Sequence, residues 1–227
     1  MNAPESDFEV FDEADAAAQL AGVRSLLSGK TRLADLGAGH GRISIPLAKA
    51  GASVLAVDRS SEALGSDEWS ASSNIQFLQE DFLSPDAHWI HAGPFDVICC
   101  LGNTLSLLLE SSMIGRLFTF ASRAVVPGGL LVFDDVPFWG HELRDPDHWP
   151  EGLSPDGAEQ LAWVPDTSLF SYRRGEQVDP ERLQPRTGER LLRLWSTSEL
   201  NEYALAEGWA AAVHREEGLI MSFLKEN

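Results

Sequence analysis

The chain has 227 residues, 44% of them hydrophobic, and a formal net charge of −18. This length and apolar content are enough for one sizeable core, so we expect a single domain over residues 1–227. The negative charge repels phosphate backbones and anionic lipids, which argues against nucleic acid or a membrane surface as partner and leaves small neutral or cationic molecules.

The first 30 residues are expected to form a helical cap. Apolar residues recur at helical spacing between residues 12 and 27, at Ala16, Leu20, Val23 and Leu27. Gly29 follows as a natural end of this helix. No basic stretch followed by an apolar segment opens the chain, and no apolar run approaches the length of a membrane span. We therefore expect a soluble, cytoplasmic protein.

Residues 31–136 are expected to form the core of the domain, where apolar runs of strand length alternate with helical patterns. The expected strands are Arg32–Leu36, Val54–Asp58, Ile75–Leu78, Phe95–Leu101 and Leu130–Asp135. A helix with an apolar stripe from Ile114 to Val125 precedes the last strand, and Pro127, Gly128 and Gly129 form a turn after it. Such alternation is typical of an α/β fold with a mainly parallel sheet covered on both faces.

The two cysteines, Cys99 and Cys100, are neighbours in the fourth expected strand. Adjacent side chains of a strand point to opposite faces, and a bridge between them would be strained. We expect both to be reduced core residues, as is usual in the cytosol.

Residues 137–195 interrupt the alternation with prolines, glycines and tryptophans. The segments QLAWV, SLFSYRR and RLLRLW read as antiparallel strands, so we expect an antiparallel insertion on the substrate side of the sheet. Residues 196–227 are expected to give a last helix, Thr197–Glu207, with a capping-box start at Thr197 or Ser198. Two strands, beginning near Trp209 and Gly218, end the chain.

The stretch LADLGAGHGR joins the first strand to a helix through Gly37, Gly39 and Gly41. Glycines let a backbone approach a ligand closely, and amides at a helix start favour an anion. A tight strand-to-helix turn without a ligand is the alternative. Asp58 ends the second strand 17 residues after Gly41, where a carboxylate can accept hydrogen bonds from both ribose hydroxyls or can cap a helix. The spacing GxGxG differs from the GxGxxG of dinucleotide sites.

Asp81 follows the third strand in FLQEDFL, at the carboxyl edge of the expected sheet. Its carboxylate could accept a hydrogen bond from an adenine amino group. The alternatives are that Glu80 takes this role or that Asp81 only caps a turn.

Five segments, DLGAGHGR, AVDRS, EDF, FDVICCLGNTLSLL and VVPGGLLVFDD, together resemble the ordered motifs of class I S-adenosylmethionine-dependent methyltransferases. The stretch CLGNTLSLL is more narrowly similar to small-molecule N-methyltransferases of the glycine, sarcosine and amino-sugar type. The resemblance implies a Rossmann-like fold whose seven-stranded, mostly parallel sheet has a reversed last strand. It also implies S-adenosyl-L-methionine as methyl donor and S-adenosyl-L-homocysteine as product.

The residues that the resemblance assigns to cofactor binding are Asp35, Gly37, Ala38, Gly39, Asp58, Arg59, Asp81, Phe82 and Leu101. Asp35 would anchor the glycine loop and meet the methionine amino group, and Asp58 would hold the ribose. Asp81 and the Phe82 amide would recognise adenine, and Leu101 would lie near the sulfonium.

The acceptor is expected at the carboxyl edge of the sheet, where open parallel sheets bind their ligands. Asn103 and Thr104 follow the fourth strand and Asp135 ends the fifth, so we expect them to bind substrate, with helix capping as the alternative. Asn103 and His141 are the candidate catalytic residues, since a histidine in the insertion could accept the substrate proton. His148 is a further candidate base. We find no cluster of metal ligands in the sequence and expect no metal.

The sequence therefore predicts a methyltransferase that acts by in-line transfer on a small-molecule acceptor, at an amine nitrogen in preference to an oxygen. We expect a monomer or homodimer. The alternatives are an O-methyltransferase on a small natural product and a non-catalytic S-adenosylmethionine-binding module.

Overall fold

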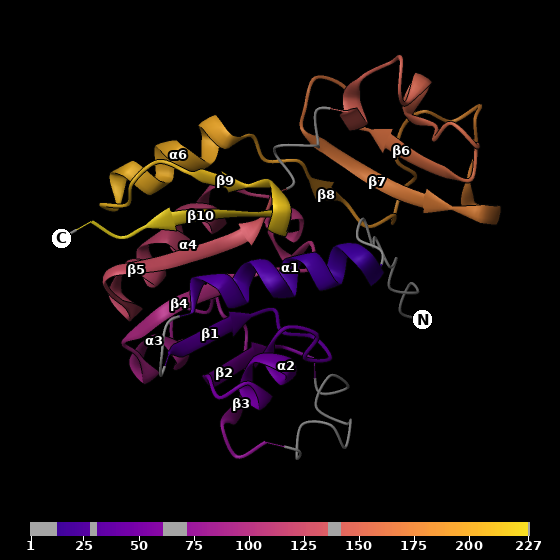
Figure 1. The fold of residues 1–227 in the computed structure, drawn as a ribbon. Coiled ribbons are helices and arrows are strands. Elements are labelled where there is room, and N and C mark those ends of the chain that lie inside the picture. The colour runs from indigo at the N-terminus through magenta and orange to yellow at the C-terminus, as the bar shows by residue number, and fades with distance from the viewer. Residues whose placement is uncertain (1–12, 28–30, 61–71, 136–141, 227) are drawn as a thin grey trace.

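The computed structural model describes residues 13–27, 31–60, 72–135 and 142–226. Within these residues the main sheet has seven strands in the order β3-β2-β1-β4-β5-β10-β9 (Figure 1). The strands are β1 (Arg32–Leu36), β2 (Ser53–Asp58), β3 (Ile75–Gln79), β4 (Phe95–Cys100), β5 (Val125–Asp134), β9 (Val213–Arg215) and β10 (Ile220–Leu224). The first five are parallel, and β10 runs antiparallel to both β5 and β9. The predicted fold class, with its reversed last strand, is confirmed.

Helices cover both faces of this sheet. One face packs against α1 (Glu13–Leu26) and α2 (Ser44–Lys49), and the other against α3 (Trp89–Ala92), α4 (Ser111–Ala124) and α6 (Thr197–Ala206). In Figure 1, α1 runs across the front of the sheet. Among the helices of the described ranges, none combines the length and the apolar content that a bilayer span requires. The predicted helix end at Gly29 lies outside the described residues.

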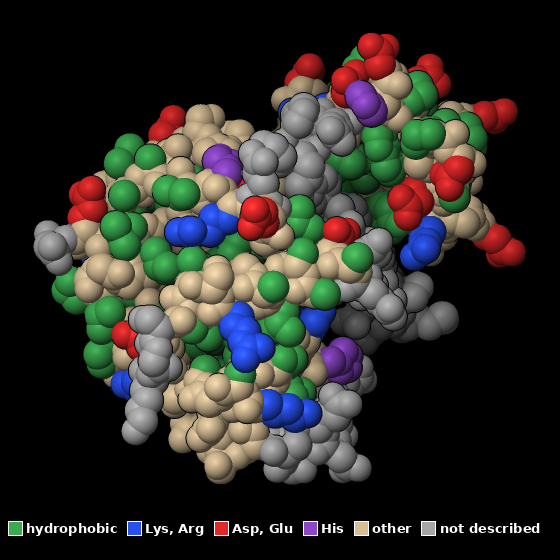
Figure 2. Space-filling view, in the orientation of Figure 1, with side chains coloured by type: hydrophobic (Ala, Val, Ile, Leu, Met, Phe, Trp, Pro, Cys, Tyr) green, Lys and Arg blue, Asp and Glu red, His purple; other side chains and the backbone are tan. Residues whose placement is uncertain are grey.

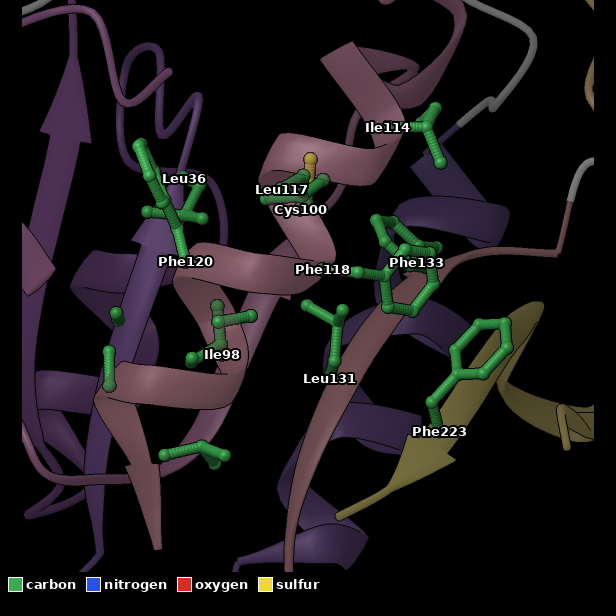
Figure 3. Close-up of a cluster of buried hydrophobic side chains, with 14 of the residues drawn as sticks. Leu36, Ile98, Cys100, Ile114, Leu117, Phe118, Phe120, Leu131, Phe133 and Phe223 are labelled. Atoms are coloured by element: carbon green, nitrogen blue, oxygen red, sulfur yellow. The ribbon is translucent and has the colours of Figure 1, made fainter. Parts of the chain in front are cut away.

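Alternate strand residues enter two separate apolar cores, so the two neighbouring cysteines are buried on opposite faces of the sheet. Cys99 is buried on the face of α1 and α2, whereas Cys100 is buried against α4, and both thiols are free. Figure 3 shows the α4 side, where Phe118 lies among strand side chains. Its ring is perpendicular to Phe223 at 5.2 Å and inclined to Phe133 at 6.0 Å, the edge-to-face arrangement that aromatic quadrupoles favour.

Strand β5 begins at Val125, five residues before the predicted Leu130. Val125 pairs with Phe95 and Leu130 with Val97, so residues 126–129 form a bulge in which Gly128 has a φ of +79°. The Gly128 amide donates to the carbonyl of Lys225 at 2.9 Å, so the glycine turn is held by the neighbouring strand segment. The predicted turn is thus a bulge inside β5, and the strand begins earlier than predicted.

Helix α6 begins at Thr197 as predicted, but its N-cap is Ser196 and not Thr197 or Ser198. The Glu199 amide donates to Ser196 Oγ at 3.2 Å, and the Ser196 amide donates to Glu199 Oε2 at 2.9 Å. These two bonds form a complete capping box.

The insertion contributes a second, antiparallel sheet, built within the described residues from β6 (Glu159–Trp163), β7 (Leu169–Arg174) and β8 (Leu192–Arg193). It lies beyond the carboxyl end of β5 in Figure 1. Leu107 of the 3-10 helix η3 (Thr104–Leu107) packs against its apolar cluster and joins it to the main sheet. Residues 136–141, where the insertion was predicted to begin, are outside the described part.

A buried arginine holds the long loop between β7 and β8. Arg173 is 1% exposed, and its Nε donates to Glu189 Oε1 at 2.9 Å. Its terminal nitrogens donate to the carbonyls of Arg182 at 2.6 Å and Gln184 at 2.7 Å. Because the charge is paired and its donors are used, its burial is compatible with a stable insertion.

Candidate active site

The glycine loop leaves β1 and turns into α2 against the end of β2. The amides of Gly37 and Ala38 both donate to the carbonyl of Val57, at 2.8 and 3.1 Å. Gly37 has a φ of +75°, and a Cβ on it would lie 2.6 Å from Thr104 Oγ1, so the neighbouring helix η3 requires glycine here. Gly39 has a φ of +51°, and a Cβ there would have no described atom within 4 Å. The loop is therefore packed at Gly37 and open at Gly39.

Asp35, at the end of β1, is 3% exposed beneath this loop. Ser44 Oγ donates to its Oδ2 at 2.6 Å. Burial raises the pKa of Asp35 to about 6, although the Ser44 hydrogen bond and the Arg42 charge oppose that rise. The site thus contains a buried carboxylate that is ionised above about pH 6 and that a bound cation would stabilise.

Asp58 ends β2 and holds two loops together. Its Oδ2 accepts a hydrogen bond from the Gly39 amide at 2.8 Å, and its Oδ1 accepts one from the Ser60 amide at 2.8 Å. A carboxylate oxygen has two lone pairs, so each can accept a further hydroxyl. Arg59, the next residue, is exposed. The carboxylate is thus fixed beside the open glycine.

The two acids after β3 have different roles. Glu80 accepts hydrogen bonds from the amides of His88 and Trp89, both at 2.9 Å, so it fixes the start of α3. Asp81 is exposed, and its Oδ1 accepts a hydrogen bond from the Leu83 amide at 2.8 Å. Phe82 is half-buried against the main core. Because Glu80 is used structurally, Asp81 is the acid of this pair that stays open to a ligand.

A cavity of about 300 Å³ lies between the glycine loop, the start of α1 and the segment after β4. Its lining residues are Ala16, Asp35, Gly37, Ala38, Gly39, His40, Arg42, Ile43, Leu101, Gly102 and Asn103. It joins six of the predicted site residues, namely Asp35, Gly37, Ala38, Gly39, Leu101 and Asn103. The others that the structure describes, Asp58, Arg59, Asp81, Phe82, Thr104 and Asp135, lie outside this lining. Arg42 and His40 are lining residues that the sequence analysis missed.

The segment after β4 is fixed by backbone contacts. Asn103 has a φ of +63°, in the left-handed region that asparagine tolerates better than most residues. Its amide donates to Asp134 Oδ2 at 2.7 Å, and the Gly102 amide donates to Asp134 Oδ1 at 3.1 Å. Thr104 Oγ1 donates to the carbonyl of Leu101 at 2.8 Å. The hydroxyl of Thr104 thus closes its own turn.

Asp134 is fully buried at the end of β5, on the side of α1. Gln19 Nε2 donates to its Oδ1 at 2.7 Å. Burial raises the pKa of Asp134 to about 6, against the opposing hydrogen bonds from the Asn103 and Gly102 amides. Gln19 was missed in the sequence, although it stands three residues after Ala16 and four before Val23 on an apolar stripe.

Asp135, predicted to bind substrate, is 1% exposed on the opposite side of the same strand end. His214 Nδ1 lies 2.8 Å from its Oδ1 and 2.9 Å from its Oδ2. His214 comes from β9 and was not predicted. His148, by contrast, contacts Asp145 at 3.1 Å on the exposed insertion. His141 lies outside the described residues and remains a prediction.

The comparisons with known proteins agree with this geometry. A family model described as "Methyltransferase domain" matches residues 33–129. "Putative methyltransferase YqeM" of Bacillus subtilis (strain 168) is 35% identical over 181 residues, 72% of this chain and 71% of that protein.

Two solved structures share the fold. The CcbJ methyltransferase from Streptomyces caelestis has a TM-score of 0.65 at 19% identity and covers 98% of this chain and 100% of its own. The sugar N-methyltransferase KedS8 from Streptoalloteichus sp ATCC 53650 has a TM-score of 0.61 at 18% identity and covers 95% and 88%. The family model, the sequence relative, the sheet order and the glycine loop agree. The chain belongs to the class I S-adenosylmethionine-dependent methyltransferases.

Proposed function

We propose that this methyltransferase acts on a small molecule at an amine nitrogen, with the methionine end of the cofactor held in the cavity at the glycine loop. For the cofactor, the observation that carries the proposal is that one cavity joins a buried carboxylate, Asp35, to a cation, Arg42, at the carboxyl ends of β1 and β4. A methionine end carries an ammonium and a carboxylate, so the two side chains complement its two charges.

The residues of the site fit the cofactor. Gly39 leaves open space where any other residue would place a Cβ, which allows a ligand to lie on the loop. Asp35 would accept from the ammonium, and Arg42 would donate to the carboxylate. Leu101, 4% exposed and lining the cavity, would flank the sulfonium. When bound, the cofactor supplies a methyl group on positively charged sulfur.

The nucleoside end would extend from the loop toward β2 and β3. Asp58 would accept from the ribose hydroxyls with the lone pairs that its two backbone contacts leave, and Ala38 and Arg59 would flank the ribose. Asp81 and the Phe82 amide would recognise adenine. The support for this path is that Asp58 holds the Gly39 amide at 2.8 Å.

The acceptor side is proposed from charge. The chain carries a net charge of −18, and Figure 2 shows acidic side chains spread over the insertion. Such a surface attracts an ammonium and repels anions. Asn103 and Asp135 would orient the acceptor, and His141 would take its proton. The sugar N-methyltransferase among the solved relatives supports a nitrogen acceptor.

The Asp135–His214 pair favours a second candidate, transfer to a hydroxyl. A hydroxyl needs a base to remove its proton during attack, and a histidine fixed by a carboxylate is suited to that task. The pair lies at the end of β5, on the side opposite to Asp134, whose Oδ1 accepts a hydrogen bond from the Gly102 amide of the cavity lining.

A matched panel of acceptors decides between the two. Amines and the corresponding alcohols or phenols are incubated with methyl-labelled S-adenosylmethionine, and label in the product is counted for the wild type and for His214→Asn. The proposal predicts labelled amines and a modest effect of His214→Asn. Labelled hydroxyl products that His214→Asn abolishes would favour the second candidate, and no labelled product from any acceptor would contradict both.

A further inference from the structure

Three walls of the proposed cofactor cavity meet on one side chain, Gln19 of α1. Gln19 is 0% exposed. Its Oε1 accepts a hydrogen bond from an Arg42 terminal nitrogen at 2.7 Å, and its Nε2 donates to Asp134 Oδ1 at 2.7 Å. The contact with Asp134 joins residues that are 115 positions apart in the chain.

The amide matches its two partners in polarity. A guanidinium only donates and a carboxylate only accepts, so a group between them must accept on one side and donate on the other. If position 19 only packed α1 on the sheet, an apolar residue would be sufficient there, as at Ala16 and Val23 on the same stripe. A buried amide costs free energy unless both ends are bonded, and here both are.

Both partners are connected to the cavity. Arg42 lines it directly, and Asp134 holds the amides of Gly102 and Asn103, which also line it. Ala16, one turn before Gln19 on α1, completes this wall. Gln19 therefore connects the helix, the cation and the segment after β4.

We propose that Gln19 is a positioning residue that couples the docking of α1 to occupation of the methionine end of the cofactor site. The inference rests on the proposed contact between Arg42 and the cofactor carboxylate. The Arg42 guanidinium has five N–H donors and uses one of them for Gln19. The remaining donors can bind the cofactor carboxylate while Gln19 keeps the guanidinium oriented. Coupling is reciprocal, so a bound carboxylate stabilises the docked helix and loss of docking weakens the ligand.

The test compares two ligands that differ only at the methionine end. S-adenosylhomocysteine carries the amino and carboxylate groups, and 5′-methylthioadenosine lacks them. For the near-isosteric Gln19→Met, calorimetry should show S-adenosylhomocysteine binding roughly tenfold weaker, the size expected for losing one charge-assisted hydrogen bond, and unchanged methylthioadenosine binding. Arg42→Met should give a selective loss at least as large, and the double variant should lose no more than Arg42→Met alone.

A pH profile separates positioning from simple structural support. Gln19→Glu keeps an acceptor for Arg42 but places a carboxylate against Asp134, so the pair needs a shared proton. Its affinity for S-adenosylhomocysteine relative to the wild type should therefore improve as the pH falls from 8 to 6.

Amide hydrogen exchange reads the coupling without any Gln19 variant. In the wild type, S-adenosylhomocysteine should slow exchange in residues 16–26 and methylthioadenosine should not, and Arg42→Met should abolish the effect. Equal weakening of both ligands by Gln19→Met, or no change of α1 exchange in the wild type, would overturn the inference alone. A wild type that binds no S-adenosylhomocysteine would instead overturn the proposed function, and the inference with it.

Discussion

Cofactor binding should depend on pH through Asp35. Its pKa is raised to about 6 by burial, so the carboxylate is about nine-tenths ionised at pH 7 and about one-tenth ionised at pH 5. An ammonium ligand binds the ionised form. The affinity for S-adenosylhomocysteine should therefore fall about tenfold, or about 1.4 kcal/mol, from pH 7 to pH 5.

Calorimetric titrations at pH 5, 6 and 7 measure this change. Asp35→Asn should bind weakly at every pH and show a flatter profile, because the titrating group is gone. Methylthioadenosine, which lacks the amino group, serves as the control and should bind almost equally at pH 5 and 7. If the two ligands show the same pH profile, the assignment of Asp35 to the methionine amino group is refuted.

The same carboxylate lowers the stability of the empty protein. Burial raises the pKa of Asp35 from 3.8 in the unfolded chain to about 6 in the folded protein, so the folded protein holds this proton more tightly. The stability that the bound proton contributes is complete below pH 3.8 and is lost as the pH rises through 6. The loss amounts to about 3 kcal/mol at pH 7 as an upper bound. Asp35→Asn should therefore unfold at no lower temperature than the wild type at pH 7, even though it loses ligand affinity. A variant that is clearly less stable at pH 7 would contradict this reasoning.

Other substitutions test packing and the insertion. Gly37→Ala should destabilise the protein by about 1–3 kcal/mol in urea, because its Cβ would meet Thr104 Oγ1 at 2.6 Å with a φ of +75°. Gly39→Ala should cost about 1 kcal/mol and mainly lower ligand affinity in calorimetry, and equal stability losses at both glycines would contradict the account. Ser196→Ala should cost about 1 kcal/mol in urea with unchanged ligand affinity, whereas an affinity change would argue against a purely local cap. Arg173→Met leaves the partly exposed Glu189 carboxylate without its main partner and should expose the insertion to limited proteolysis, while S-adenosylhomocysteine still binds. Loss of binding would show that the insertion supports the cofactor site.

The predicted site residues that line the cavity come mainly from one local stretch of the chain. A strand, a glycine loop and a helix follow one another within residues 32–49, and that single stretch contributes the predicted lining residues Asp35, Gly37, Ala38 and Gly39. The start of β5 was misplaced because Pro127 and two glycines read as a turn. The pairing of Val125 with Phe95 across the bulge depends on long-range register, which composition does not encode.

Two of the residues that were missed, Gln19 and His214, act through distant partners. Gln19 contacts Asp134 across 115 positions and His214 contacts Asp135 across 79, so no local spacing predicts either pair. A polar residue on the apolar stripe of α1 was the one available signal for Gln19. At the start of α6, three hydroxyl residues precede Glu199 in the sequence, namely Ser196, Thr197 and Ser198. The residue that caps the helix is set by the position at which the helix begins.

Calorimetric titration of the full chain with S-adenosylhomocysteine tests the central claim most directly, with Asp58→Ala as the site variant and the exposed Asp86→Ala as the matched control. We predict one-to-one binding to the wild type and to Asp86→Ala, and a loss of at least tenfold in Asp58→Ala. Equal binding by all three proteins would contradict the placement of the cofactor on the glycine loop and its acids, and no binding by the wild type would contradict the proposed function itself.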